Sequence, residues 1–310
     1  MKLTGIAILA ISFIFTTALS QMKLIEDSEK GTLTIIDGQA DVLTYCFGDQ
    51  LQEGWDSRHT RSCFIHPLFS LDGKILTDNF PKDHLHHHGV FWTWPVVKTR
   101  GQDTQTWHSV TPSLRQHFVR WLERKVEKDV ATLIVENVWK LDSKEVVAKE
   151  TVRLHVHPAN DIGRTIDLEL KIQAVGGPLE LQGAQDQKKG YGGLCVRGAP
   201  MFKGSALTTD QGLLKKDSTN VSFHWADMST EELGVAIFVS PDHPGYPTTW
   251  LIRNSYAGIL NASWPGLESV ELQPGKPVTL RYRLYVHRGD ATAGRVRQAY
   301  VQYLSTLQRK

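Results

Sequence analysis

Short β-forming segments separated by turn residues constrain the fold of this chain most strongly. Six such segments cover residues 32–36, 130–139, 145–156, 165–174, 234–239 and 278–286. Each has about the length of one strand, and few show the period of a helix. In the third, Val152, Leu154 and Val156 alternate with polar residues, which is typical of a half-buried antiparallel strand.

The C-terminal segment, residues 291–307, has a helical pattern instead. Apolar residues from Ala293 to Leu307 recur there at spacings of three and four. Gly294 leaves the start of this helix open. Many strands, one short helix and frequent turn residues predict an all-β fold, a large antiparallel β-sandwich with a short C-terminal helix.

The N-terminus predicts a secretory signal peptide over residues 1–20. An early lysine precedes an apolar run from Gly5 to Leu19, and small residues follow. The run is shorter than the roughly 20 residues of a spanning helix. We therefore expect a periplasmic or secreted protein with no membrane insertion after cleavage, and a single domain over residues 21–310.

Charge and cysteine content narrow the range of partners. The formal net charge is +2 and no block of like charges occurs, so nothing favours nucleic acid. The cysteines Cys46, Cys63 and Cys195 are too few for a disulfide scaffold. Either Cys46 and Cys63 form a bridge or all three cysteines are buried free thiols.

A block of histidines, Asp83-His84-Leu85-His86-His87-His88-Gly89, holds four of the thirteen in the chain. Histidine titrates near neutrality and is the commonest neutral metal ligand, so this density indicates a functional site. If the block is an extended strand, His84, His86 and His88 share one face and His87 points to the other.

Two chemistries fit the block. His84, His86 and His87 could act as general acids and bases, or His84 and His86 could hold a divalent metal with His66. Any one of these histidines could equally be a hydrogen-bonded structural residue. A further metal ligand would have to come from another part of the chain, such as Glu150, Asp167 or His243.

A second constellation runs from His243 to Arg253. Three prolines stiffen its loop, which lowers the entropy lost when the loop orders around a ligand. Trp250 offers a flat apolar face and Arg253 a fork of donors, a pairing that suits a sugar ring. The alternative is a structural loop that ends in a core tryptophan.

Two further residues complete the candidate set. Arg197 follows a glycine-rich stretch, and it could hold an anion or a carbonyl group or form a structural salt bridge. The spacing of that stretch is not that of a phosphate loop. Trp107, next to His108, is a candidate stacking residue among nine tryptophans, most of which must be core residues.

These motifs carry a family resemblance. His66-Pro67-Leu68, the histidine block, Trp107, residues 192–197 and residues 243–253 resemble the PmoA-like family of exported bacterial proteins, over about residues 31–289. The label implies a methane-oxidising membrane enzyme, whereas this chain has no apolar segment of spanning length. The occurrence of the family in glycan-degrading bacteria, and an expected galactose-mutarotase-like supersandwich, imply carbohydrate instead.

We therefore expect an exported lyase, hydratase or hydrolase that acts on a saccharide or an oxidised keto-sugar, with an oligosaccharide or another small molecule as substrate. Two alternatives are a non-catalytic carbohydrate-binding protein and a metal-dependent oxygenase. The cofactor is open and includes a divalent metal. The predicted catalytic residues are His84, His86, His87 and His243, and the predicted binding residues are Trp107, Arg197, Trp250 and Arg253.

Overall fold

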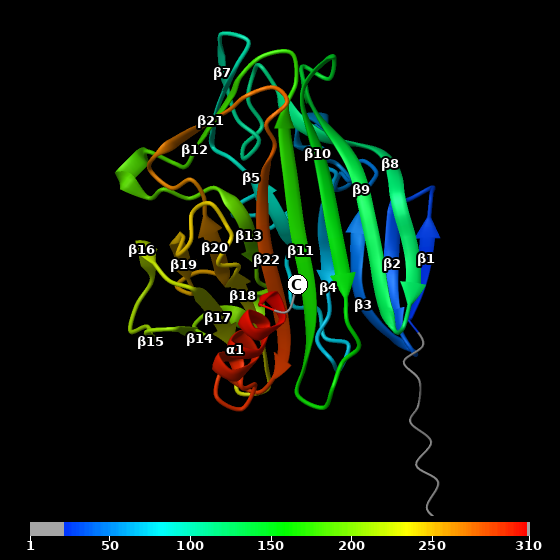
Figure 1. The fold of residues 1–310 in the computed structure, drawn as a ribbon, viewed down its shortest axis with the longest axis vertical. Helices are drawn as coiled ribbons and strands as arrows, with labels where there is room; N and C mark the ends of the chain where they lie inside the picture. Colours follow the sequence, from blue (N-terminus) through cyan, green and yellow to red (C-terminus); the bar gives the residue numbers. More distant parts are fainter. Residues whose placement is uncertain (1–21, 309–310) are drawn as a thin grey trace, which may run out of the picture.

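The computed structural model describes residues 22–308, and its strands form two nine-stranded sheets and one four-stranded sheet (Figure 1). The predicted signal peptide at residues 1–20 lies outside the described residues. Every strand pair within them is antiparallel. The predicted all-β class and antiparallel sandwich are confirmed.

Each sheet brings together strands that are far apart in the sequence. In spatial order, the first sheet contains β1 (Met22–Asp27), β2 (Thr32–Asp37), β3 (Ala40–Cys46), β4 (Phe64–Leu68), β5 (Val90–Thr93), β13 (Gly193–Arg197), β20 (Ile259–Ser263), β19 (Thr249–Arg253) and β16 (Ser218–Ser222). The second contains β15 (Gly212–Leu213), β14 (Ala206–Thr209), β17 (Trp225–Ser229), β18 (Leu233–Val239), β22 (Val278–Arg288), β11 (Gly163–Ala174), β10 (Glu145–Val156), β9 (Val130–Leu141) and β8 (Leu114–Glu127). The small sheet contains β21 (Ser269–Leu272), β12 (Leu179–Gln182), β6 (Val96–Thr99) and β7 (Gln102–Thr104). The helical elements are α1 (Val296–Leu307) and the short 3-10 turns η1 (Ser57–His59), η2 (Asp186–Lys188) and η3 (Pro200–Phe202).

Alternation along the strands builds the core between the two large sheets. In β10, Val152, Leu154 and Val156 are fully buried, whereas Lys149 and Arg153 on the same strand are exposed. Strands of both sheets contribute buried residues to one continuous apolar cluster. Each of the six strands expected from the sequence is present, because apolar period-two segments can bury one face only by pairing in this way.

A buried carboxylate lies in the middle of this core. Glu150 Oε2 accepts hydrogen bonds from the indole Nε1 of Trp92 at 3.0 Å and of Trp139 at 2.9 Å, and Oε1 accepts one from Asn137 Nδ2 at 2.9 Å. Burial raises the pKa of Glu150, and these hydrogen bonds lower it in part. Glu150 therefore has a structural role, and its suggested role as a metal ligand is wrong.

The C-terminal helix α1 covers the outer face of the second sheet (Figure 1). Val296, Tyr300 and Tyr303 pack there against residues of β17, β18 and β22. The helix begins at Val296, later than the predicted segment, because the Gly294 carbonyl accepts a hydrogen bond from Tyr285 and Arg295 is left-handed. The predicted helix is confirmed with a shorter extent.

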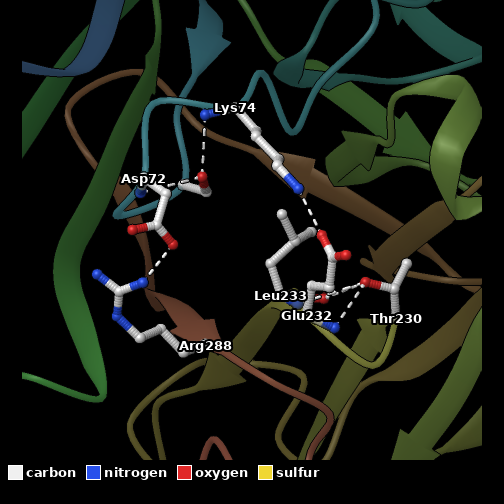
Figure 2. Close-up of polar contacts among 7 residues, drawn as sticks. Asp72, Lys74, Thr230, Glu232, Leu233 and Arg288 are labelled. Carbon is white, nitrogen blue, oxygen red and sulfur yellow. Dashed lines mark hydrogen bonds and ion pairs between the residues drawn. The ribbon is translucent and has the colours of Figure 1, made fainter.

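Ion pairs join the two large sheets at one end of the molecule. Lys74 pairs with Glu232, and Asp72 pairs with Arg288 at the end of β22 (Figure 2). Lys74 and Asp72 lie in the loop after β4, so each pair links the first sheet to the second. All four side chains are about half exposed or more, so each pair contributes little to stability, about 0–1 kcal/mol.

The remaining sequence expectations concern thiols and the membrane. All three cysteines, Cys46, Cys63 and Cys195, are buried free thiols. This was the second of the two alternatives, and Cys46 and Cys63 form no disulfide bond. No helix between residues 22 and 308 is both long and apolar enough to cross a membrane.

We predict that Glu150→Leu lowers the free energy of unfolding by about 3 kcal/mol or more, since three buried donors lose their acceptor at about 1–3 kcal/mol each. Lys149→Leu, the exposed neighbour on the same strand, should change it by less than about 0.5 kcal/mol. Urea denaturation measures both. Equal effects of the two substitutions would contradict this role for Glu150.

Candidate functional site

The candidate site lies on the outer face of the first sheet. In β13, Leu194 and Val196 pack into the sandwich core, whereas Cys195 between them belongs to a separate cluster on the other side. Neighbouring strands repeat this arrangement, so the middle of this sheet is apolar on both faces. The outer cluster consists of Cys46, Phe64, Phe91, Trp107, Cys195, Leu251 and Ile259, with Tyr191 and Tyr256 packed against it.

The histidine block covers this outer cluster as two consecutive turns. His84 N donates to Pro81 O at 3.0 Å and His87 N donates to His84 O at 2.9 Å. Gly89 follows with φ 57°, and a Cβ there would lie 2.2 Å from Ile65 O, so only glycine fits. The predicted extended strand is wrong, because these turn hydrogen bonds replace strand pairing.

The turns change which histidines lie together. His84, His86 and His87 line one hollow, which we call the histidine pocket. His88 turns away, packs among Phe64, Phe80 and Phe91 and donates from Nδ1 to Asn79 Oδ1 at 3.0 Å. The predicted grouping of His88 with His84 and His86 is therefore wrong. The pocket encloses about 540 Å³ open to solvent, and its other lining residues are Trp107, His108, Lys189, Tyr191, Leu251, Arg253, Tyr256 and Ile259.

Aromatic rings form one wall of the histidine pocket. The His84 ring stacks on Tyr256 at a centroid distance of 5.2 Å and on His87 at 4.8 Å. Trp107 meets His87 edge-on at 5.8 Å and is only 3% exposed. The predicted binding residue Trp107 thus lines the pocket, but the half-buried Tyr191 and Tyr256 offer the more open ring faces.

Arg197 contacts His87 and fixes its orientation. It is 3% exposed, and its NH2 donates to both oxygens of Asp83, at 3.0 and 3.2 Å. Its NH1 lies 3.1 Å from His87 Nδ1. A guanidinium can only donate, so Nδ1 is the acceptor and neutral His87 carries its proton on Nε2. Arg197 therefore positions His87 and does not line the pocket itself.

Burial keeps His86 and His87 neutral. Burial, followed by the charges of His108 and His84, lowers the pKa of His86 to about 2. Burial also lowers the pKa of His87 well below its usual range, with His86 and Arg197 as further causes. His86 and His108 have ring centroids 4.0 Å apart. A neutral imidazole has one N–H donor and one lone pair, so it can donate one hydrogen bond and accept a proton.

Cationic side chains complete the rim. Arg253 lines the pocket, and its guanidinium has no hydrogen-bond or ion-pair partner among the described residues. Lys189 also lines it and donates to Asp186 at 2.7 Å. The pocket therefore combines aromatic faces, neutral imidazoles and a free fork of donors, which suits a polar ligand with an apolar face.

Two predicted site residues lie in the core instead. His243 is 3% exposed, and its Nε2 lies 2.9 Å from the Tyr282 hydroxyl. Trp250 is fully buried and donates to Phe223 O at 2.9 Å. In β19, Trp250 and Ile252 face the core, and the period of two leaves Arg253 on the outer face. The expected roles of His243 in catalysis and Trp250 in binding are thus wrong.

The metal hypothesis gains no geometric support. Over residues 22–308, no three His, Cys, Asp or Glu side chains are arranged to hold a metal ion. The suggested set of His66, His84 and His86 is thus not assembled, and His66 Nδ1 instead lies 3.0 Å from the Thr77 hydroxyl. The other suggested ligand, Asp167, is bound to Arg283 on the second sheet.

Several pocket residues were not among the sequence-based candidates. His108, Lys189 and Tyr191 belong to the stretches that contain Trp107 and Arg197, and they could have been found by considering every residue of those stretches. Tyr256 lies in a loop with no periodic pattern. Its approach to the histidine block depends on long-range folding, which no local signal reports.

Comparisons with known proteins give one family and several distant structural likenesses. Residues 32–301 match the model of a family described as "Family of unknown function (DUF6807)". No curated protein matches the chain. One similar solved structure is a galactose mutarotase related enzyme from Lactobacillus acidophilus, with 8% identity and a TM-score of 0.44 over 86% of this chain and 97% of that one.

Two other structures are similarly distant. A putative aldose 1-epimerase from Klebsiella pneumoniae has 12% identity and a TM-score of 0.44, covering 88% of this chain and 83% of that one. A GalM/aldose epimerase homologue from C. elegans has 9% identity and a TM-score of 0.38, covering 86% and 98%. Likenesses this distant carry no information about the activity of the present chain.

We predict that the free energy of unfolding falls as the pH is lowered from 7 to 5. His87, His88 and His243 are at most 4% exposed and have lowered pKa values. The unfolded chain therefore binds protons below its histidine pKa of about 6.5 that the folded chain does not, which costs up to about 1.4 kcal/mol per pH unit for each histidine.

Urea unfolding at pH 5, 6 and 7 measures this dependence, and His87→Gln should reduce the slope by the contribution of one histidine. A free energy of unfolding that is constant or rises toward pH 5 would contradict the neutral state of these imidazoles.

Proposed function

The chain belongs to DUF6807, a family of unknown function, and we propose that its histidine pocket binds a saccharide or an oxidised sugar and transforms it by imidazole acid/base chemistry. The observation that carries this proposal is the pairing of neutral His86 and His87 with aromatic faces and a free guanidinium in one open hollow.

The side chains that line the histidine pocket indicate a saccharide as the class of ligand. The C–H face of a sugar ring packs against aromatic rings, in this pocket those of Tyr191 and Tyr256. Its hydroxyl, carbonyl or carboxylate oxygens accept hydrogen bonds from Arg253 and from the Nε2–H of His87. A purely apolar ligand would leave these donors without acceptors inside the pocket.

His86 and His87 divide the chemistry between them. The Arg197 contact leaves His87 as a hydrogen-bond donor, so it polarises a carbonyl or ring oxygen by a hydrogen bond from Nε2–H. His86 stays unprotonated at neutral pH and accepts a proton from a hydroxyl group or from a carbon beside a carbonyl. Epimerisation, elimination, hydration and hydrolysis all use such a proton removal and return.

A non-catalytic saccharide-binding protein is the second candidate. The observation that favours it is the low pKa of His86, about 2, since such an imidazole is a weak base at neutral pH. Under this alternative the imidazoles only exchange hydrogen bonds with the sugar. Export and the PmoA-like resemblance stay predictions from the sequence, as does the choice among lyase, hydratase and hydrolase.

We predict that His86→Ala lowers turnover by about a hundredfold or more, because it removes the proton acceptor, while the melting temperature changes little. NMR of purified protein with a panel of hexoses, hexuronates, keto-glycosides and disaccharides measures binding and turnover together. His224→Ala, a partly exposed histidine that does not line the pocket, is the matched control and should keep wild-type turnover.

Turnover that is unchanged in His86→Ala would remove His86 from the mechanism. Binding across the panel without any turnover would favour the binding protein over the enzyme. Absence of binding by the whole panel would contradict the saccharide proposal itself.

A further inference from the structure

A second cavity adjoins the histidine pocket and has no part in the chemistry proposed above. It encloses about 910 Å³ open to solvent, and His108 lines both hollows. It lies where the segment before β4 meets the start of β8. The charged side chains that line it are Arg58, Arg61, Arg115, Asp49 and Asp142.

Arg61 is a buried cation with no counter-charge among residues 22–308. It is 7% exposed, and it donates only to neutral acceptors, Thr60 O at 3.1 Å and the Ser109 hydroxyl at 3.3 Å. Burial, followed by the like charge of Arg115, lowers the pKa of Arg61 to about 10. Buried charges in proteins are normally paired, so an unpaired guanidinium in this position requires an explanation.

Arg115 approaches the same point from β8. Its NH1 lies 3.4 Å from Thr60 O, the oxygen that Arg61 also contacts, so the two guanidinium groups converge on one carbonyl. Its Nε is buried with no hydrogen-bond partner among the described residues. Two converging cations with a spare donor form a binding arrangement for an anion with several oxygen atoms.

The carboxylates of the cavity do not neutralise this pair. Asp142 Oδ1 accepts from the Ser113 backbone and hydroxyl, at 2.8 and 3.3 Å, and Asp49 is exposed. Within residues 22–308, neither forms an ion pair with Arg61 or Arg115. The counter-charge is therefore not supplied by the described part of the chain.

The positive charge of Arg61 acts on the imidazoles of the histidine pocket. It contributes, after burial, to the lowered pKa values of His86 and His108. An anion at Arg61 would offset that charge and make His86 a stronger base. Occupation of the second cavity would thus favour the proton transfer proposed for the first.

We infer that the cavity around Arg61 and Arg115 is an anion subsite, which holds a carboxylate or sulfate group of an acidic saccharide whose neighbouring sugar unit occupies the histidine pocket. This inference rests on the proposed function and specifies its substrate class. The two hollows share a wall at His108, so two linked sugar units could occupy them together.

The test compares the binding of digalacturonate with that of its neutral counterpart, a galactose disaccharide, by isothermal titration calorimetry at fixed ionic strength. Wild-type protein should bind the acidic disaccharide at least about tenfold more tightly, and Arg115→Gln should reduce this preference to about twofold or less. Arg61→Gln should act in the same way, with the melting temperature of each variant as a folding check. Arg120→Gln is the matched control, because Arg120 lies on the same strand as Arg115, is exposed, pairs with Glu136 and does not line the cavity, so the preference should persist.

Inorganic sulfate forms the second arm and separates the two proposals. If the anion subsite is real and the histidine pocket does not bind sugar, sulfate binds wild type and not Arg115→Gln, while the neutral disaccharide fails to bind. If the subsite is wrong, the neutral disaccharide still binds, and the acidic preference is absent or is the same in wild type and in both arginine variants.

Discussion

The first sheet buries apolar side chains on both of its faces, and the candidate site depends on this constraint. One face packs against the second sheet in the sandwich core, and the other carries a separate apolar cluster under the loops. A sheet with one solvated face would offer no apolar cluster for the histidine block to pack against. Because successive residues point to opposite faces, β13 directs Leu194 and Val196 to the core and Arg197 to the site.

Electrostatics then decides what the site can do. Arg197 is bound by Asp83 and leaves His87 a neutral donor, whereas Arg61 has no carboxylate partner among the described residues and leaves neighbouring imidazoles in a positive field. Burial and this positive field both disfavour the imidazolium form of the neighbouring histidines. The site therefore favours an electron-rich or anionic ligand, and residues 22–308 do not provide such a group. His108 lines both hollows, so the sugar unit and the acidic group of one ligand would occupy adjacent sites.

Much of the fold could be predicted from the sequence, because period-two segments and turn residues are local signals. Six strands of the sandwich and the C-terminal helix follow from them, whereas the other strands were not predicted. The site was predicted less well. The density of histidines identified the block, but its conformation depends on turn hydrogen bonds that composition does not show. Trp250 and His243 belong to the core because of strand direction and long-range packing, and Tyr256 reaches the pocket only after the chain has folded. Arg253, predicted as a binding residue, lines the pocket.

A crystal structure with an acidic disaccharide bound tests the central claim most directly. We predict electron density for one sugar unit against Tyr256 and Tyr191, with a ligand oxygen within hydrogen-bond distance of His87 Nε2, and density for the acidic group beside Arg115. Ligand density elsewhere on the molecule, with the histidine pocket empty, would contradict it.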